Sequence, residues 1–587
     1  MNLKFLKHFV LYVSLVAFPL FAQQVHIKII ETTDTHGAIF PYDFTNLKPL
    51  NHSLAQVYSY VKEQRKDTAQ SVLLFSNGDI LQGTPVVYYY NFEVPQKPHL
   101  YARVMNFMKY DLASVGNHDI EPGHDVYDRF RKEINFPWLA ANAVREDNGE
   151  PYFQPYQTFN VKGVKIAVLG MITPGIPNWL PKILWSGMYF DDMVNTAKKW
   201  VRIIQEKEKP DILIGLFHAG VDLSYGGSSE VYMNENASQA VAEEVSGFDL
   251  VFVGHDHHGW NYKVANKSTQ DSVIILGGTS SARVFAVADF YDDLSQRDLD
   301  SVKTKLIDSK NYEPDSVFMQ TFKPQFDSVK NYVEQPLGTF TKSIDSRKAL
   351  FGESEFVDLV HLVQLKLTGA QISFAAPLSM HAKIDSGEII VGDMFKLYHY
   401  ENYLYTMRLK GSEIKKALEY AASMWFNQMK SKDDHLLNFE YDKNGKIKYS
   451  ERYNSPVLKG RFYNFETAAG INYQIDVTKP AGERVEIFSL SDGTPFDTSA
   501  FYAVALNSYR GNGGGGHLTK GAGIPKDELS KRLIKSSKRD FRFLMMKWIE
   551  KQKKITPPFF GNWKIVPENW VKKAAKRDYE LMFGNEK

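Results

Sequence analysis

Short apolar runs alternate with segments of helical periodicity through the first half of the chain. The runs lack the polar alternation of a half-exposed sheet and are typical of strands buried on both faces. They are VHIKII from 25, VLLF from 72, KIAVLG from 165, DILIGLF from 211, LVFVG from 250 and VIILGG from 273. Between them, residues 190–206 place apolar side chains at helical spacing. The alternation predicts a layered α/β domain.

The pattern changes at residues 303–336, a polar segment with three prolines and no run typical of a buried strand. We interpret it as a partly helical connection between two domains. The chain length also favours two domains, because single cores usually split beyond roughly 250 to 300 residues. The predicted organisation is a first domain at 23–302, the connection, and a second domain at 337–587.

The second domain is predicted to contain a strand at 403–409 that leads through Lys410-Gly411 into a helix. Ser412 is the expected N-cap of this helix. Its buried face is expected to carry Ile414, Ala417, Leu418 and Ala421.

Residues 1–22 have the order of a secretory signal peptide. Lys4 and Lys7 precede an apolar run from Phe9 to Phe21, and Ala22 offers a small residue for cleavage. A membrane anchor is the alternative, but the run is shorter than the roughly 20 apolar residues that span a bilayer. No other stretch is apolar enough to cross a membrane, so we expect a soluble mature chain in the periplasm or outside the cell.

Two features of the composition narrow the chemistry. The sequence has no Cys, which excludes disulfides, lipid attachment through cysteine and thiolate metal ligands. Removal of residues 1–22, which carry two Lys and no acid, lowers the formal net charge from +2 to 0. A balanced chain argues against non-specific wrapping of nucleic acid, so we expect no stable nucleic-acid complex.

Residues of metal-binding types follow five strand ends. They are Asp34 and His36 after the first strand, Asp79 after the second, Asn117 in SVGNHDIEPG, His218 at the end of the strand from 211, and His255 and His257 after the strand from 250. In open α/β sheets such ends line the ligand crevice. One Asp or His after a strand is usually a capping or surface residue, but five agreeing ends indicate a shared site.

These residue types suit a pair of cations. Two divalent ions about 3.5 to 4 Å apart can share a carboxylate bridge, while imidazoles and a neutral amide fill the remaining positions. Mixed nitrogen and oxygen ligands favour Zn, Mn, Fe or Co over Mg or Ca. We therefore expect two divalent metal ions, whose identity the sequence leaves open.

Five motifs resemble, in the same order, those of the calcineurin-like metallophosphoesterases. They are D-x-H at 34–36, GD at 78–79, GNH at 116–118, His218 and GHxH at 254–257. The segments YENYLYTMRLKG from 400, GINYQIDVTKP from 470 and NSYRGNGGGG from 507 resemble the bacterial family of 5′-nucleotidases and 2′,3′-cyclic-nucleotide 2′-phosphodiesterases. The resemblance covers nearly the whole mature chain. It implies a four-layer metallophosphoesterase β-sandwich flanked by helices, followed by a C-terminal α/β domain that binds a nucleotide substrate.

The resemblance also implies roles for these residues. One metal would be bound by Asp34, His36, Asp79 and His257, and the other by Asp79, Asn117, His218 and His255, with Asp79 as the bridge. His118 would stabilise the transition state or protonate the leaving oxygen while water attacks phosphorus in line. Many 5′-nucleotidases place an Asp three residues after this histidine to orient its ring. Here the position is Glu121, which is either a longer orienting carboxylate or a solvated loop residue.

In the family, two aromatic rings of the C-terminal domain enclose the nucleobase. The glycine spacing places Tyr509 and Phe465 there, with Tyr463 as a close competitor. Every base has a π face, so such stacking tolerates any base. The predicted substrate-binding residues are Phe465, Tyr463, Tyr509, Arg510, Gly513 and Gly514. Without the resemblance, the aromatic residues would be interpreted as core side chains.

The predicted function is an exported nucleotide phosphoesterase that acts on 2′,3′-cyclic nucleotides and 3′-nucleotides; the alternative is a broad 5′-nucleotidase. In 5′-nucleotidases, an Asp after the stacking aromatic binds the ribose 2′ and 3′ hydroxyls, and here that position is Gly515. The arginine-bearing segment that holds the phosphate in those enzymes is replaced by SFAAPLSM at 373–380. ETTD at 31–34 and Tyr509-Arg510 followed by glycines resemble the cyclic phosphodiesterase branch.

Two alternative functions are compatible with the same fold. A non-catalytic surface protein of the same fold is disfavoured, because every expected metal position and His118 are present. A thiosulfate-handling relative is disfavoured by the base-stacking aromatics and by the absence of cysteine.

Overall fold

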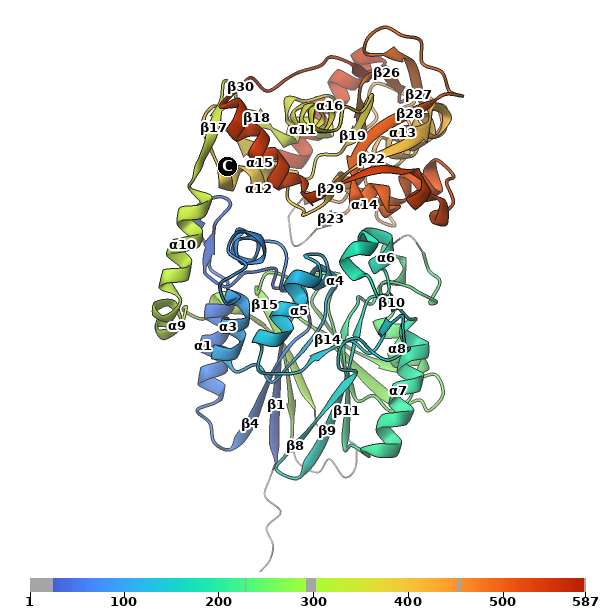
Figure 1. Cartoon of the computed structure of the whole chain (residues 1–587). Helices are drawn as coiled ribbons and strands as arrows, with labels where there is room; N and C mark the ends of the chain where they lie inside the picture. Colours follow the sequence, from blue (N-terminus) through green and yellow to red (C-terminus); the bar gives the residue numbers. More distant parts are fainter. Residues whose placement is uncertain (1–24, 227, 292–301, 451–454, 585–587) are drawn as a thin grey trace, which may run out of the picture.

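The computed structural model describes residues 25–226, 228–291, 302–450 and 455–584. The predicted signal peptide lies outside these residues. Figure 1 shows an N-terminal unit, coloured blue to green, below a C-terminal unit, coloured yellow to red. Helix α10 (Lys323–Val333) runs along one side between them. Within the described part of the chain, no helix is both long and apolar enough to cross a membrane.

Two six-stranded sheets pack face to face in the N-terminal unit. The first has the order β16 (Lys303–Asp308), β15 (Val284–Phe290), β1 (His26–Thr32), β4 (Gln70–Ser76), β5 (Leu112–Ser114) and β6 (Trp138–Leu139). The second has the order β13 (Trp260–Ala265), β14 (Ser272–Gly277), β12 (Leu250–Val253), β11 (Ile212–His218), β9 (Val164–Ile172) and β8 (Tyr156–Val161). Strands β1, β4, β5 and β6 are parallel, as are β9, β11, β12 and β14. The six strands predicted from apolar runs are therefore confirmed.

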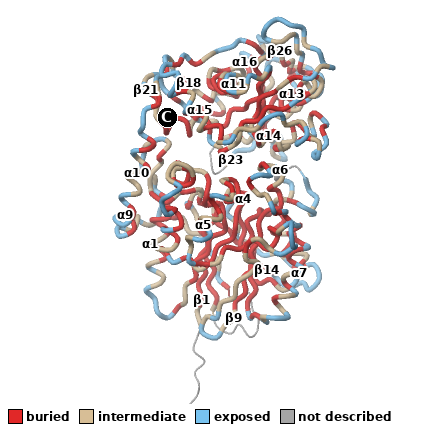
Figure 2. The backbone as a smooth tube through the Cα atoms, in the orientation of Figure 1, coloured by how far each residue is buried: buried red, intermediate tan, exposed pale blue. Residues whose placement is uncertain are grey.

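Helices complete a four-layer arrangement. Apolar residues of both sheets, including Ile29 and Ile214, form the core between them. Helices α1 (Leu54–Gln64), α3 (Leu100–Met108) and α5 (His124–Glu133) cover the first sheet, and α7 (Met193–Lys207) and α8 (Ser238–Glu244) cover the second. Shorter elements are β2 (Tyr42–Asp43), β3 (Lys48–Pro49), α2 (Pro85–Tyr88), α4 (Asn117–Ile120), β7 (Ala143–Arg145), α6 (Ile176–Trp179) and β10 (Met188–Phe190). Figure 2 shows the strands buried at the centre, so the predicted four-layer fold is confirmed.

Segment 303–336 contains a strand that the sequence pattern did not predict. Strand β16 pairs antiparallel with β15 and extends the first sheet. It is an edge strand with exposed polar positions, so it lacks the apolar run of a buried strand. Helix α9 (Ser316–Thr321) follows, and its Phe318 packs against Phe40 and Phe107. The start of the connection is thus tied to the N-terminal unit.

A five-stranded sheet forms the centre of the C-terminal unit. Its order is β25 (Thr467–Ala469), β19 (Ile372–Ala375), β28 (Phe501–Asn507), β22 (Tyr403–Lys410) and β29 (Leu533–Asp540). The smaller sheets contain β17 (Pro336–Phe340), β18 (Ile344–Asp345), β20 (Lys383–Ile384), β21 (Gly387–Ile390), β23 (Tyr449–Ser450), β24 (Ser455–Pro456), β26 (Ile471–Asp476), β27 (Val485–Leu490), β30 (Lys554–Ile555) and β31 (Trp563–Val566). The helices are α11 (Glu355–Thr368), α12 (Val391–Leu397), α13 (Gly411–Trp425), α14 (Ser508–Gly511), α15 (Phe541–Gln552) and α16 (Glu568–Phe583).

Strand β22 and helix α13 occur where the sequence predicts them, but the predicted N-cap is wrong. The N-cap is Lys410, and Ser412 lies inside the first turn. The backbone N–H of Lys410 donates to Glu413 at 2.7 Å, and that of Ser412 donates to the Thr498 carbonyl at 2.8 Å. These partners satisfy the first turn without a serine cap. The predicted apolar face of α13 is buried.

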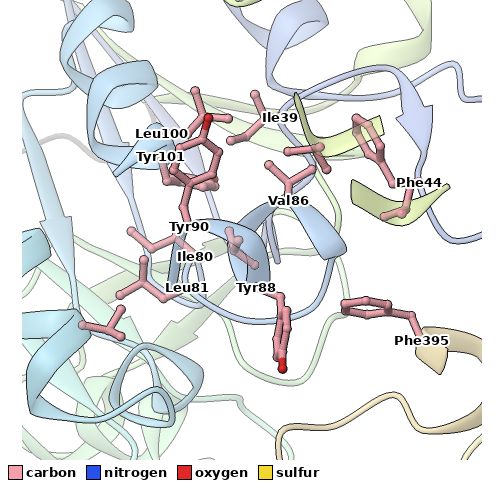
Figure 3. Packing of buried hydrophobic residues seen from close by; sticks show 14 of the residues in the cluster. Ile39, Phe44, Ile80, Leu81, Val86, Tyr88, Tyr90, Leu100, Tyr101 and Phe395 are labelled. Atoms are coloured by element: carbon pink, nitrogen blue, oxygen red, sulfur yellow. The ribbon is translucent and has the colours of Figure 1, made fainter. Parts of the chain in front are cut away.

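Aromatic and charged side chains join the two units. Tyr88 of α2 packs edge-on against Phe395 of α12, with ring centroids 5.4 Å apart, as Figure 3 shows. The Tyr88 hydroxyl donates to Asp540 at 3.0 Å. The Arg542 guanidinium lies over both rings. The units are therefore in direct contact through buried groups.

Candidate metal centre and substrate side

The predicted metal ligands lie at one edge of the two sheets. Because neighbouring parallel strands end on the same side, their carboxyl ends bring distant residues together. Strand β1 leads to Asp34 and His36, β4 to Asp79, β5 to Asn117, β11 ends in His218, and β12 leads to His255 and His257.

Five of these residues have a left-handed backbone. The φ angles are 49° at Asp34, 48° at His36, 55° at Asp79, 73° at His255 and 62° at His257. Such conformations cost on the order of 1–3 kcal/mol each in a non-glycine residue, although Asp and His tolerate them better than most. Left-handed conformations of this kind persist where the surrounding structure enforces them. Here they occur in three loops, after β1, β4 and β12, that meet at one site.

Four side chains form a first group that could hold a metal ion, namely Asp34, His36, Asp79 and His257. The Nε2 atoms of His36 and His257 are 3.0 Å apart, and His257 Nε2 is 3.4 Å from Asp34 Oδ1. His36 Nε2 lies 3.9 Å from Asp79 Oδ2. The donor atoms thus converge on one small volume.

A second group shares Asp79 with the first and adds His218 and His255. His218 Nε2 lies 3.1 Å from Asp79 Oδ2. Asn117 Oδ1 is 3.2 Å from His218 Nε2 and 2.8 Å from His255 Nδ1, so Asn117 belongs to this group. Each group therefore has four donors, and Asp79 stands between the groups.

The donor set fits two divalent cations. Asp79 Oδ1 accepts the backbone N–H of His118 at 2.8 Å, whereas the buried Oδ2 faces His218 Nε2 at 3.1 Å and His36 Nε2 at 3.9 Å. Oδ2 therefore lies next to donors of both groups. Imidazole nitrogens and carboxylate oxygens in this mixture suit Zn, Mn, Fe or Co.

The clustered charges shift the histidine pKa values in opposite directions. Burial and the neighbouring His257 lower the pKa of His36 to about 3, which keeps its imidazole neutral and able to bind a metal. Burial alone would lower the pKa of His218, but Asp79 and Asp34 raise it to about 10. A cation at His218 must therefore displace a proton, so metal binding weakens as the pH falls.

The buried carboxylate of Asp119 orders the loops that carry Asp79 and Asn117. It accepts backbone N–H groups from Asp79 at 3.0 Å, Ile80 at 2.8 Å, Leu81 at 3.0 Å and Gly116 at 2.8 Å. The pattern of strand ends did not indicate this residue. Its position three residues after Gly116, as in a capping box, was a usable signal.

His118 and Glu121 form a pair beside the metal groups. His118 Nδ1 is 2.5 Å from Glu121 Oε2, and Glu121 is 8% exposed, so the longer carboxylate is not a solvated loop residue. Burial alone would lower the pKa of His118, but Asp79, Glu121 and, more weakly, Glu401 raise it to about 9. Glu401 belongs to the C-terminal unit, so both units contribute charge around this ring.

Two family models match the chain. The calcineurin-like phosphoesterase model matches residues 27–259, and the model of the 5′-nucleotidase C-terminal domain matches residues 336–520. The chain thus joins a calcineurin-like phosphoesterase domain to a 5′-nucleotidase C-terminal domain.

Four sequence relatives that align over more than 90% of the chain are nucleotide phosphoesterases by name. The trifunctional nucleotide phosphoesterase protein YfkN of Bacillus subtilis is 27% identical over 93% of this chain, which spans 39% of that protein. The 2′,3′-cyclic-nucleotide 2′-phosphodiesterase/3′-nucleotidase of Yersinia enterocolitica is 24% identical over 93% of this chain and 89% of its own length. A candidate 5′-nucleotidase from Staphylococcus aureus has the same fold, with a TM-score of 0.74, 20% identity and coverage of 92% of this chain and 99% of its own.

The nucleotidase domain presents Tyr509 at its junction with the phosphoesterase domain. Tyr509 lies on α14, which faces α6 of the phosphoesterase domain (Figure 1). A Cβ atom on Gly514 would come within 2.6 Å of the Tyr509 ring. Gly514 therefore acts by letting the ring pack against the backbone, while the φ of 99° at Gly513 explains the glycine there.

Phe465, one of the predicted base-stacking residues, is buried in the nucleotidase domain. It is 1% exposed and stacks on Trp425 within the nucleotidase core, with ring centroids 5.1 Å apart. Tyr463 is partly buried. It packs against a cluster of buried apolar residues that contains side chains of both domains. The base-stacking role of Phe465 stays a prediction, and its competitor Tyr463 is the more exposed of the two rings.

Arg510, another predicted substrate-binding residue, is buried and held by polar groups of the nucleotidase domain. Its guanidinium donates to Glu466 at 2.5 Å, to the Gly514 carbonyl at 2.6 Å and to the Tyr463 carbonyl at 3.1 Å. The side chain is 1% exposed. It connects the segments that carry Tyr463 and Tyr509.

Replacement of Arg510 by Met is expected to destabilise the nucleotidase domain by about 3–5 kcal/mol, because it leaves the Glu466 carboxylate buried without its cation. Urea unfolding monitored by tryptophan fluorescence measures the loss. Arg408→Met, at an exposed strand position, is the control and should change stability little. Unchanged stability of the Arg510 variant, with a higher KM for nucleotides, would instead make Arg510 a substrate ligand.

Two further residues at the centre gave no signal in the sequence. The Trp179 ring of α6 stacks on His255, with centroids 5.6 Å apart and an interplanar angle of 28°. Glu235 lies in the loop before α8, with Oε2 3.8 Å from His255 Nε2. Neither occurs at the end of a strand, so the pattern that located the ligands could not locate them.

Proposed function

We propose that the chain is a two-cation nucleotide phosphoesterase that converts 2′,3′-cyclic nucleotides and 3′-nucleotides to nucleoside and phosphate. The observation that carries the proposal is the convergence of six donor side chains around Asp79. The names of the Bacillus and Yersinia relatives support the substrate class.

The residues beside the metal groups account for the proton transfer. Two divalent cations held there would activate the attacking water and neutralise the phosphoryl oxygens. Since His118 Nδ1 is engaged by Glu121, Nε2 is the atom left to donate a proton to the leaving oxygen. With a cyclic substrate, water adds to phosphorus and the bond to O2′ breaks, and O2′ takes the proton. The 3′-phosphate then reacts in the same way.

The geometry at Gly515 supports the preference over 5′-nucleotides. Its φ is 69°, and a Cβ atom there would overlap Arg510 Nη1 and Asn464 Oδ1. The site therefore has no room for the carboxylate that binds free ribose hydroxyls in 5′-nucleotidases. A 2′,3′-cyclic phosphate has no free hydroxyl pair and does not need that carboxylate.

We expect kcat/KM for 2′,3′-cyclic AMP and 3′-AMP to exceed that for 5′-AMP by roughly 10- to 100-fold, as the loss of a charge-assisted hydrogen bond worth about 1.5–3 kcal/mol predicts. Phosphate and nucleoside release with Mn²⁺, Co²⁺ and Zn²⁺ measures the rates. p-Nitrophenyl phosphate, which has no ribose, is the reference substrate. A clear preference for 5′-AMP would reject the proposal in favour of the broad 5′-nucleotidase.

We also propose that the protein is exported. The support is the charge and hydropathy order of residues 1–22, with Lys4 and Lys7 before the apolar run. N-terminal sequencing of protein from the periplasm or medium should begin after Ala22. Protein that retains residues 1–22 in the membrane fraction would indicate an anchor.

A further inference from the structure

We infer that Glu235 positions the His255 imidazole for the cation held by Asp79, Asn117 and His218. The inference rests on the proposed two-cation site. It adds a residue outside the ligand set, on the loop between β11 and α8.

The two nitrogens of His255 have opposite surroundings. Nδ1 is 2.8 Å from Asn117 Oδ1 and so faces the metal group. Nε2 points away from that group, is buried and has no hydrogen-bond partner among the residues that the structure describes. The carboxylate of Glu235 lies 3.8 Å from Nε2. A buried N–H without an acceptor is costly, and a carboxylate is its strongest acceptor.

Two other histidines of the centre already have the corresponding support. His36 Nδ1 is 3.1 Å from the Gln82 carbonyl, and His218 Nδ1 is 2.6 Å from the Asn77 carbonyl. Such contacts fix the tautomer and the ring orientation of a metal ligand. At His255 a carboxylate, not a carbonyl, stands on the outer side, and about 1 Å of movement would bring it into hydrogen-bond distance.

Packing alone does not decide which of two orientations the His255 ring adopts. Trp179 stacks on its face, which holds the plane of the imidazole. A half-turn about the Cβ–Cγ bond keeps that plane but exchanges Nδ1 with a carbon atom. An acceptor opposite Nε2 favours the orientation in which Nδ1 faces the metal group. Glu235 therefore favours one of the two ring orientations that the stacking contact with Trp179 allows.

The backbone around Glu235 is held firmly against the segment that follows His218. The Asn234 amide donates to the carbonyls of Leu223 at 3.0 Å and Glu230 at 2.8 Å. On the other side, Ser238 donates its backbone N–H to the Gly220 carbonyl at 3.1 Å. With its backbone fixed and its side chain partly buried, Glu235 needs only a small side-chain movement to reach His255 Nε2.

The test compares Glu235→Ala and Glu235→Gln with wild type, with Glu230→Gln, an exposed position in the same loop, as the matched control. Metal-free protein is titrated with Mn²⁺ alone by calorimetry and electron paramagnetic resonance, which report affinity independently of catalysis. In Glu235→Ala, one of two Mn²⁺ sites should weaken about 10- to 100-fold while the other is unchanged. Glu235→Gln should lie between this variant and wild type, because its amide oxygen still accepts a hydrogen bond. Glu230→Gln should match wild type.

Several outcomes would overturn the inference. Unchanged affinity at both sites in a folded Glu235→Ala protein shows that Glu235 does not position His255. If that variant also raises KM for nucleotides but not for p-nitrophenyl phosphate, Glu235 contacts the nucleoside part of the substrate instead. Wild-type protein that binds fewer than two Mn²⁺ ions rejects the two-cation site itself, which is a failure of the proposed function and is distinguishable from the first two.

Discussion

Replacement of Asp79 by Asn is expected to abolish turnover and to remove at least one of two bound cations. Among the described residues, Asp79 belongs to both candidate metal groups, and its buried Oδ2 lies 3.1 Å from His218 Nε2 and 3.9 Å from His36 Nε2. A neutral amide lacks the charge that bridges two cations, so both would lose their shared ligand. Asn tolerates the φ of 55° at this position, whereas Ala would add backbone strain.

Metal content by mass spectrometry, kcat with 2′,3′-cyclic AMP and thermal unfolding in a chelator separate loss of metal from loss of fold. Asp271→Asn, at an exposed carboxylate, is the control and should retain two cations and the full rate. The shared-ligand role of Asp79 is wrong if active wild-type protein contains one cation per chain and Asp79→Asn keeps its normal rate.

The sequence could locate the metal residues because each follows or ends a short apolar strand. Because neighbouring parallel strands end at the same edge of a sheet, residues that follow them lie close together. His218 and Asn117 meet at this edge although they are 101 positions apart. The left-handed φ angles at Asp34 and His255 could not be predicted, because they depend on packing around the loops and not on residue type alone.

The substrate side was predicted less well. The motif spacing could not distinguish Tyr463 from Phe465, since the chain there forms a 3-10 turn at Phe462–Asn464 and does not alternate like a strand. The role of Arg510 depends on Glu466, a partner 44 positions away that no local pattern indicates. Contacts of this kind arise only when the tertiary structure forms.

The sequence pattern also could not predict which side chains form the junction between the domains. Arg542 is fully buried, stacks on Tyr88 and Phe395 and donates to Glu401. The charge of Glu401 in turn raises the pKa of His118 in the other domain. A residue of the nucleotidase domain thus contributes to the charge around His118 in the phosphoesterase domain.

Replacement of His118 by Ala is expected to lower kcat by at least about 10²-fold, the typical effect of losing a positioned proton donor, while both cations are retained. The metal-facing contact of residue 118 is its backbone N–H, which donates to Asp79 Oδ1 and is still present in alanine. The ring is held through Nδ1 by Glu121 and is one-quarter exposed, so its Nε2 can reach a substrate oxygen. KM should change less than kcat, because the proton is needed in the transition state rather than in binding.

His124→Ala is the matched control, since His124 also pairs with a carboxylate, Asp128, at 3.0 Å but belongs to α5 outside the metal groups. Its kcat should stay at the wild-type value. Glu121→Gln should fall between wild type and His118→Ala, because an amide can still accept the Nδ1 proton but no longer stabilises the imidazolium. A substrate with a good leaving group, p-nitrophenyl phosphate, should lose much less rate in His118→Ala, since its leaving oxygen needs little protonation. Equal losses on both substrates would mean that His118 acts on the phosphoryl oxygens instead, and an unchanged kcat would remove it from the mechanism.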